Sequence, residues 1–185
     1  MNVKDILNPT VRLLVITAIA AALLGFVRDV TLDPIAERQK EGEAAAISSI
    51  FANADESKEE VIESELVSRV LSVYAQGEFI GYAVFTSSVG YGGAVDLLVG
   101  VNADKVIQGV QILNHTETPG LGANAANAPF LDQYKDKSQA LTVSKSAPAG
   151  NEIQAITSAT ITSTAVTNGV NSALIFVSSL PGGGK

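Results

Sequence analysis

The sequence contains no cysteine and only one histidine, His115, among its 185 residues. Without cysteine the chain can form no disulfide, no thiolate nucleophile and no cysteine-ligated iron–sulfur cluster. One histidine is too few for a multi-histidine metal site, so we predict that the chain holds no metal. Any redox chemistry would therefore have to take place on an organic cofactor.

Positive charge is scarce as well, since 12 Lys and Arg oppose 19 Asp and Glu and leave a net charge of −7. The phosphates of a nucleic acid require a basic protein face, so we predict no nucleic-acid partner. Apolar residues make up 46% of the sequence, which is enough to form a buried core. The length fits one globular domain with an additional segment.

That additional segment contains an uncharged apolar run, Leu13–Val27, which lies between Arg12 and Arg28. The run is shorter than the roughly 20 residues of a usual transmembrane helix, but flanking arginines extend the span by snorkelling. No small-x-small cleavage site closes it, which favours a retained single-pass anchor over a cleaved signal peptide or a buried soluble helix. The basic residues on its two sides are nearly equal in number and do not decide its orientation.

The next segment is acidic. Residues 33–65 contain ten acidic and three basic residues. Asp33-Pro34 predicts a helix start, with Asp33 as N-cap, and an amphipathic helix to about residue 52. We therefore divide the chain into an N-terminus and anchor at 1–30 and an acidic helical linker at 31–65. A docking surface for a basic partner is the alternative interpretation of the acidic residues.

A third segment, residues 66–180, predicts an α+β domain with a mainly antiparallel sheet. Short runs rich in Val, Ile and Leu predict strands at Phe79–Phe85, Ala94–Val101 and Val106–Leu113. Residues 102–104 predict the turn between the last two. Helical spacing of apolar residues predicts a packed C-terminal helix at 163–179. Residues 181–185 are expected to form a flexible tail.

Two glycine-containing segments have compositions that core packing alone does not explain. Gly90-Tyr91-Gly92-Gly93 permits positive φ and close backbone approach, although a glycine-rich hairpin turn would explain it equally well. His115–Gly122 mixes short hydroxyls, a carboxylate and glycines around a proline, and it offers N–H groups to an anion or a flat polar ring. It lacks the Gly-Lys-Ser/Thr ending of a P-loop. His115 by itself is more typical of a hydrogen-bonded histidine than of a ligand.

The third segment of interest is Ile156–Thr164, which carries six hydroxyls in nine residues before the predicted last helix. Helix capping by Ser or Thr is the structural explanation, but one cap needs only one hydroxyl. A helix N-terminus also receives phosphate well, through its free N–H groups and the positive end of the helix dipole. A threonine hydroxyl at this place could therefore accept a phosphoester.

Taken together, these segments resemble the FMN-binding domain shared by the G subunit of Rnf-type complexes and the C subunit of sodium-pumping NADH:quinone reductases. The resemblance runs from about Gly77 to Val177. It is carried by Gly90–Gly93 with Val95–Gly100 after it, by Glu117–Gly122 and by Thr157–Thr160. In that family a flavin transferase joins the last threonine of a Ser/Thr-Gly-Ala-Thr motif to the phosphate of FMN.

The resemblance implies a set of cofactor-binding residues. Thr160 would carry FMN as a covalent phosphoester. Around it the resemblance places a second group, which consists of Thr157, Ser158, Ala159, Glu117, Thr118, Gly120, Leu121, Gly122 and Lys145. Two positions depart from the family pattern, because Ser158 stands in place of glycine and Gln154 in place of aspartate. Both departures concern recognition by the transferase and hence the efficiency of attachment.

The implied function is electron relay by FMN in a membrane complex that couples ferredoxin and NAD electron transfer to Na⁺ or H⁺ transport, with no catalytic residue beyond the flavin. The implied partners are the other membrane and peripheral subunits, the transferase and the lipid bilayer. In this family the flavin domain lies outside the bacterial cytoplasmic membrane. Three alternatives remain: the equivalent C subunit of the reductase, a stand-alone anchored flavoprotein reductase, and a structural subunit that has lost its flavin. The chain length favours the G subunit.

Overall fold

The structure is a computed structural model that describes residues 3–60, 64 and 66–180. The predicted flexible tail at 181–185 lies outside the described residues. The chain divides into two compact units, Met1–Gly42 and Glu43–Lys185. The end of the first helix, from Glu43, thus belongs to the same unit as the sheet, whereas the sequence assigned it to a linker.

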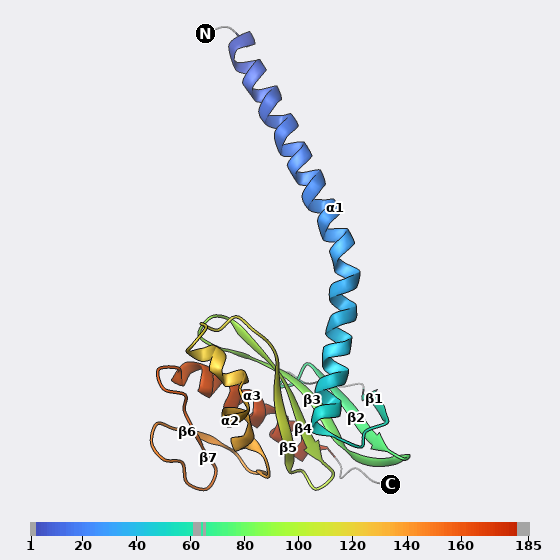
Figure 1. Ribbon diagram of the computed structural model, residues 1–185, viewed down its shortest axis with the longest axis vertical. Coiled ribbons are helices and arrows are strands. Elements are labelled where there is room, and N and C mark those ends of the chain that lie inside the picture. Colours follow the sequence, from blue (N-terminus) through green and yellow to red (C-terminus); the bar gives the residue numbers. More distant parts are fainter. Residues whose placement is uncertain (1–2, 61–63, 65, 181–185) are drawn as a thin grey trace. The chain divides into compact units, whose positions relative to one another are not determined.

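The N-terminal helix α1 runs without interruption from Val3 to Ile50 (Figure 1). The predicted helix start at Asp33-Pro34 is therefore wrong, because both residues lie inside α1. A proline inside a helix lacks the N–H that would bond to the carbonyl four residues earlier. The helix of 48 residues contains two such prolines, Pro9 and Pro34, and it continues through both.

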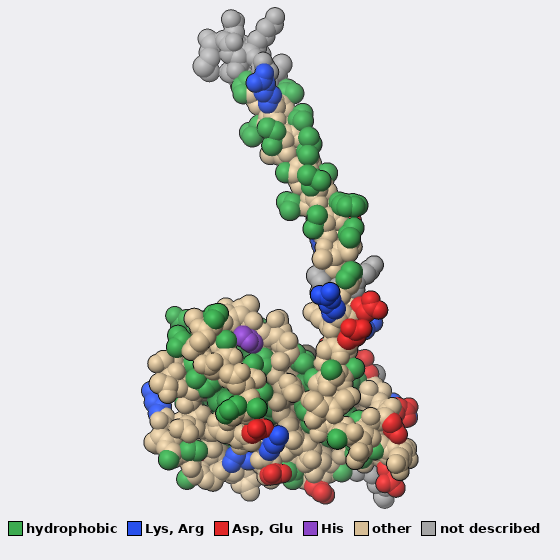
Figure 2. Space-filling view, in the orientation of Figure 1, with side chains coloured by type: hydrophobic (Ala, Val, Ile, Leu, Met, Phe, Trp, Pro, Cys, Tyr) green, Lys and Arg blue, Asp and Glu red, His purple; other side chains and the backbone are tan. Residues whose placement is uncertain are grey.

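Within the first unit, α1 is apolar on all sides. Its large apolar side chains from Val11 to Leu32 are exposed, and Figure 2 shows them along the whole length of this part of the helix. The segment Pro9–Ile50 has a window of mean hydropathy 2.2 with none of it buried. Thr17 donates its hydroxyl to the carbonyls of Leu13 and Leu14 at 3.0 Å, which satisfies it inside the helix. By length and composition α1 can cross a membrane.

In the second unit, five strands form an antiparallel sheet in the order in which they follow along the chain. The strands are β1 (Glu56–Glu60), β2 (Arg69–Ala75), β3 (Glu78–Val89), β4 (Ala94–Asn102) and β5 (Ile107–His115). The last three confirm the predicted strands and their antiparallel pairing. The predicted turn is present, and the side-chain oxygen of Asn102 accepts the N–H groups of Asp104 and Val106.

The C-terminal helix α3 (Thr160–Ser179) packs on one face of this sheet (Figure 1). Its buried side chains, among them Val166 and Val170, form the main core with Leu97 and Val99 of β4. The helix begins three residues before the predicted start at 163, so Thr160 is its first residue. This packed helix on a mainly antiparallel sheet confirms the predicted α+β fold.

The connection from β5 to α3 contains only short elements. They are η1 (Gly122–Ala126), α2 (Ala128–Leu131), η2 (Asp132–Tyr134) and two short parallel strands, β6 (Thr142–Ser144) and β7 (Glu152–Gln154). Tyr134 is fully buried in this segment, and its hydroxyl lies 2.8 Å from that of Thr167 on α3. The connection therefore covers the helix and closes the core beside it.

The opposite face of the sheet is covered by the last turns of α1. Ile47 and Phe51 join Val73, Phe85 and Leu98 in a second apolar cluster. Alternate residues of β4 thus point to different cores, Leu97 toward α3 and Leu98 toward the end of α1. Both faces of β4 are therefore buried, which gives the site a rigid support.

Candidate functional site

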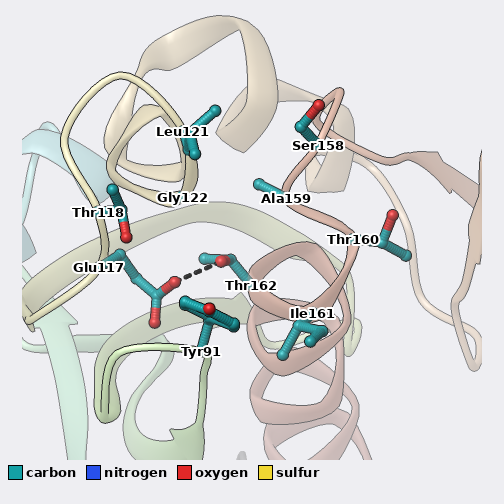
Figure 3. A pocket seen from close by; sticks show the side chains of 10 residues that line it. All are labelled: Tyr91, Glu117, Thr118, Leu121, Gly122, Ser158, Ala159, Thr160, Ile161 and Thr162. Carbon is teal, nitrogen blue, oxygen red and sulfur yellow. Dashed lines mark hydrogen bonds between the residues drawn. The ribbon is translucent and has the colours of Figure 1, made fainter.

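A cavity of about 570 Å³ lies where the three sequence segments of interest meet. Its lining comes from the β3–β4 hairpin, the loop after β5 and the first turn of α3 (Figure 3). The lining residues are Tyr91, Glu117, Thr118, Leu121, Gly122, Ser158, Ala159, Thr160, Ile161 and Thr162. The size falls within the range of roughly 300–1,000 Å³ that small-molecule and cofactor sites occupy.

Glu117 ties the three segments together. Its Oε1 accepts the N–H of Gly92 at 3.0 Å, and its Oε2 accepts the hydroxyl hydrogen bond of Thr162. Figure 3 shows the Glu117 and Thr162 side chains pointing toward each other at the base of the cavity. Glu117 is 6% exposed. A buried carboxylate with several donors is the arrangement expected for a charged group that fixes neighbouring segments in place.

The protonation of Glu117 follows from this environment. Burial alone raises the pKa of its carboxyl group, but the Thr162 hydroxyl, the N–H groups of Gly92 and Tyr91 and the nearby His115 outweigh that effect. The net result is a pKa below the ordinary value of 4.5. Glu117 is therefore negatively charged at neutral pH.

The glycines of the hairpin are explained by the close approach of Glu117. The N–H of Gly90 donates to the carbonyl of Gly93 at 2.7 Å and closes the turn. A Cβ at Gly90 would overlap the Glu117 carboxylate, and one at Gly92 would overlap the Thr116 carbonyl. On the other side, a Cβ at Gly122 would lie 2.6 Å from the Thr162 hydroxyl. The segment is thus a glycine-rich hairpin turn, and its glycines are needed because Glu117 and Thr116 lie so close to them.

His115 has a structural place beside Glu117. Its Nδ1 accepts the N–H of Glu117 at 3.2 Å, which fixes the start of the loop. This agrees with the interpretation of a hydrogen-bonded histidine. In the described part of the chain, no group of three or more His, Asp or Glu side chains converges as a metal site.

The start of α3 is open. Ala159 is its N-cap residue and makes no side-chain cap, so within the described residues the hydroxyl-rich run does not cap the helix. The first N–H groups of any helix lack intrahelical partners, and the first residues of α3 line the cavity. Such groups, together with the positive end of the helix dipole, favour an anion.

The hydroxyls of this run have different environments. Thr162 and Ser163 are almost completely buried, and Ser163 accepts the N–H of Ile156 and donates to the carbonyl of Ala159, both at 3.0 Å. Thr160 is half-buried, lines the cavity and has no hydrogen-bond partner among the residues that the structure describes. In Figure 3 it stands apart from the Glu117–Thr162 pair, at the edge of the site.

The structure gathers most of the predicted site residues and separates three. Thr157 lies in an exposed turn and does not line the cavity. Gly120 adopts φ +76°, and its Cβ position faces open space, so glycine is used there for its conformation and not for close approach. Lys145 follows β6, is exposed and is not part of the lining.

Three lining residues were not among the predicted ones, namely Tyr91, Ile161 and Thr162. Tyr91 and Ile161 are large side chains within a glycine-rich and a hydroxyl-rich motif. This contrast in the sequence could have identified them as lining residues. Thr162 could not have been distinguished from the other hydroxyls by sequence, because its role depends on the distant Glu117. The complete arrangement offers an anion-receiving helix start, a free hydroxyl and an apolar cavity, which suits a phosphorylated cofactor with a flat ring.

Comparison with known proteins agrees with this geometry. Residues 90–175 match the FMN-binding domain family. The G subunit of the Na⁺-translocating ferredoxin:NAD⁺ oxidoreductase complex of Acetobacterium woodii is 40% identical over 177 residues, which cover 86% of this chain and 85% of that protein. The G subunit of the ion-translocating oxidoreductase complex of Methanosarcina acetivorans is 35% identical, and the match covers 97% of this chain and 98% of that protein.

A shorter match is more similar. The G subunit of the proton-translocating ferredoxin:NAD⁺ oxidoreductase complex of Clostridium ljungdahlii is 50% identical over 105 residues, 56% of this chain and 57% of that protein. Among solved structures, the C subunit of the Na⁺-translocating NADH-quinone reductase of Parabacteroides distasonis superposes with a TM-score of 0.55 at 20% identity. That superposition covers 75% of this chain and 85% of the other, and it shows a shared fold.

Proposed function

The chain belongs to the family of G subunits of ion-translocating oxidoreductase complexes, and on that premise we propose that it carries electrons on a covalently bound FMN. The complex would couple electron transfer between ferredoxin and NAD⁺ to the transport of Na⁺ or H⁺. Its other membrane and peripheral subunits would supply electrons to this FMN and accept them from it.

The observation that carries the proposal is the free hydroxyl of Thr160 at the edge of the cavity. Thr162 and Ser163 are buried and hydrogen-bonded, so a transferase could not reach them without opening the site. Thr160 is accessible, lines the cavity and is the first residue of α3. Ser158 also lines the cavity, and the family resemblance selects Thr160 between the two.

FMN, when bound, supplies the reversible one-electron and two-electron chemistry. The residues of the chain would hold it: the first-turn N–H groups of α3 would face its phosphate. Thr118 and the backbone around Leu121–Gly122 would meet the ribityl chain or ring. The charged carboxylate of Glu117 below them would oppose added negative charge in the cavity and thereby influence the flavin potential.

The loss of glycine at position 158 does not remove the local conformation. Ser158 adopts φ +65°, the left-handed conformation that glycine adopts readily. The attachment segment therefore keeps the backbone that a glycine would give, which argues against a structural subunit that has lost its flavin. A stand-alone reductase would show turnover in isolation, and we expect none.

At a membrane, α1 would serve as a single-pass anchor, and membrane association fits both the helix and the family. We place the second unit on the extracytoplasmic side, with a short cytoplasmic N-terminus. A flavin transferase on the same side would then form the bond between Thr160 Oγ1 and phosphorus as it displaces the leaving group of an activated flavin nucleotide.

Peptide mass spectrometry of protein from a host that contains the transferase tests the attachment. We expect the mass of FMN less one water on Thr160, and flavin fluorescence that survives denaturation. Thr160→Ala should abolish this fluorescence, whereas Thr157→Ala and Thr164→Ala, two exposed hydroxyls outside the cavity, should retain it. Thr162→Ala should also retain some attachment. A Thr160→Ala protein that still carries covalent flavin would contradict the assignment.

A further inference from the structure

Ser163 lies near the start of α3, is completely buried and does not line the cavity. Its hydroxyl makes two hydrogen bonds, both to the segment that precedes the helix. Oγ accepts the N–H of Ile156 and donates to the carbonyl of Ala159, each at 3.0 Å. Serine favours a helix interior less than alanine does, because its hydroxyl competes for backbone groups. The two bonds therefore give a reason for serine at this buried position.

The two bonds close a tight turn, residues 156–159, that leads into α3. Inside the turn the N–H of Ala159 donates to the carbonyl of Ile156 at 2.9 Å, and Ser158 adopts φ +65°. Ala159 is the N-cap residue of α3 but provides no side-chain cap. The hydroxyl of Ser163 reaches back from the helix instead and holds both ends of the turn.

Thr160 follows this turn directly and is the first residue of α3. Figure 3 shows it where the chain enters the helix, at the edge of the cavity. Before the turn, the N–H of Ala155 donates to the carbonyl of Ser144 at 2.8 Å, which fixes the segment to β6. Because the Thr160 hydroxyl has no hydrogen-bond partner among the described residues, its position depends on the backbone that Ser163 holds.

We propose that Ser163 is a positioning residue for the flavin attachment: its hydroxyl holds the turn in the shape in which Thr160 is presented to the transferase. The inference rests on the proposed function, because it needs Thr160 as the attachment site. In the attachment step, the bond between Thr160 Oγ1 and the phosphorus of FMN forms while the pyrophosphate bond of a flavin adenine dinucleotide breaks. AMP leaves, the hydroxyl proton passes to a base of the transferase, and nothing is oxidised or reduced.

The preformed turn matters because the reacting hydroxyl must meet the phosphorus in one geometry. A reacting group that is held in place needs less ordering in the transition state, and a displacement of about 1 Å costs up to roughly 100-fold in rate. Ser163 is buried behind the turn and its hydroxyl is bonded to backbone groups, so it does not reach the reacting atoms. Its loss should slow the transfer without removing the acceptor hydroxyl.

Thr167, one turn further along α3, supplies a matched control. It is 2% exposed, and its Oγ1 donates to the carbonyl of Ser163 at 2.9 Å, as Ser163 donates to the carbonyl four residues before it. Its other contact is the hydroxyl of Tyr134 at 2.8 Å. Thr167 is thus the same kind of buried hydroxyl on the same helix, but its hydrogen bonds do not lead to the turn.

The rate of flavin transfer provides the test. Full-length protein from a host without the transferase is incubated in detergent with purified transferase and FAD, and covalent flavin is measured by fluorescence after denaturation. Ser163→Ala should lower kcat roughly tenfold or more at an unchanged KM for the acceptor protein, because the Thr160 hydroxyl is present but less often in place. Thr167→Val should transfer at the wild-type rate. The unfolding midpoints of both variants separate a loss of rate from a loss of stability.

Hydrogen exchange examines the turn without any flavin. In wild-type protein the N–H of Ile156, which donates to Ser163, should exchange more slowly than the N–H groups of its exposed neighbours Thr157 and Ser158. Ser163→Ala should raise the exchange rate of Ile156 to that of these neighbours. Thr167→Val should leave the exchange of Ile156 unchanged.

The outcomes separate this inference from the proposed function. Wild-type protein that gains no covalent flavin would contradict both. If wild type is flavinylated and Ser163→Ala reacts at the same rate or faster, the role of Ser163 alone is overturned. An equal loss of rate in Thr167→Val would overturn it too, because lost stability would then explain the effect. If Ser163→Ala does not fold, wild-type exchange decides: an Ile156 N–H that exchanges as fast as those of Thr157 and Ser158 overturns the inference, and a slower one supports it.

Discussion

Ser158 occupies a backbone conformation that L-amino acids with a Cβ rarely adopt. Its φ of +65° lies in the left-handed region, where most residues other than glycine lose about 1–2 kcal/mol. The residue also lines the cavity and stands two positions before Thr160. The resemblance gives glycine at this position, and the observed φ provides a physical reason for that preference.

We expect Ser158→Gly to stabilise the folded protein. The substitution removes the left-handed strain of about 1–2 kcal/mol, and the greater freedom of glycine in the unfolded chain offsets roughly 0.5–1 kcal/mol of this gain. A net increase of up to about 1.5 kcal/mol should appear as a higher midpoint in thermal or urea unfolding of the full chain in detergent. Ser158→Ala keeps the strain and is the control. Equal midpoints for Gly and Ala would remove strain as the explanation.

The carboxyl group of Glu117 should make the stability of the folded protein depend on pH. The pKa of its carboxyl group is lowered in the folded protein, so the folded state binds a proton less readily than the unfolded chain does. Its stabilising contribution is complete above the ordinary value of 4.5 and is lost as the pH falls through the lower folded value. The unfolding midpoint should therefore decrease with acidity in this range. Because Glu117→Gln has no carboxyl group to titrate there, its midpoint should decrease less.

At neutral pH the same substitution should destabilise the protein. Glu117 accepts hydrogen bonds from Gly92 and Thr162, and bonds to a charged group contribute about 1.5–3 kcal/mol. The midpoint of Glu117→Gln should thus lie below that of wild type at pH 7, and the difference should narrow on acidification. A difference that stays constant from pH 7 to pH 3 would contradict the assigned protonation of Glu117.

At the scale of elements, the sequence predicted three strands from their apolar runs, but it missed β2, although β2 buries Val70 and Val73. β3, β4 and β5 bury Val84, Leu97 and Ile107, so their composition is distinctive. β1 escaped prediction because all residues of Glu56–Glu60 are exposed and the strand exists only by pairing with β2. The continuity of α1 at Pro34 was missed because Asp33-Pro34 is a local signal for a helix start. The long helix continues through this signal.

The site shows the same division. Glycine, hydroxyl and carboxylate types indicated the three segments that meet at the cavity. Their mutual contacts could not be predicted, because Glu117 and Thr162 are 45 residues apart and only the packed fold brings them together. Gly120 and Lys145 were assigned to the site by resemblance, but neither residue lines the cavity. A Cβ at Gly120 would face open space, and Lys145 is exposed.

The contact between the end of α1 and the sheet depends on glycine at the paired positions Gly100 and Gly109. A Cβ at Gly100 would overlap Cγ2 of Ile50, whereas one at Gly109 would lie 3.2 Å from Cγ1 of the same residue. Gly100→Ala should therefore destabilise the folded protein by about 1–3 kcal/mol, the usual cost of overpacking. Gly109→Ala should cost less.

Thermal unfolding of the two variants measures this difference. The double variant Gly100→Ala/Ile50→Ala tests the cause, because a smaller residue at position 50 makes room for the added methyl group. It should cost less than the sum of its two single variants. Strict additivity of the two changes would show that Gly100 does not act through its contact with Ile50.

At the scale of the whole molecule, the two compact units differ in how much apolar surface they expose. Met1–Gly42 exposes apolar side chains along its helix, whereas Glu43–Lys185 has two buried cores of its own. A bilayer or other membrane proteins would cover the apolar side chains of the first unit and remove them from water. The second unit carries the cavity and needs access to electron partners.

The proposed sidedness yields the last prediction. Because the basic residues on the two sides of Leu13–Val27 are nearly balanced, charge does not determine the orientation, and the expectation of an extracytoplasmic flavin domain comes from the family. Protease added to spheroplasts should therefore remove the second unit, since exposed sites such as Lys58 would face the medium. A cytoplasmic protein should stay intact in the same sample. In inverted vesicles the second unit should be protected. The opposite pattern, with digestion only in inverted vesicles, would reverse the orientation while leaving the anchor and the flavin site unaffected.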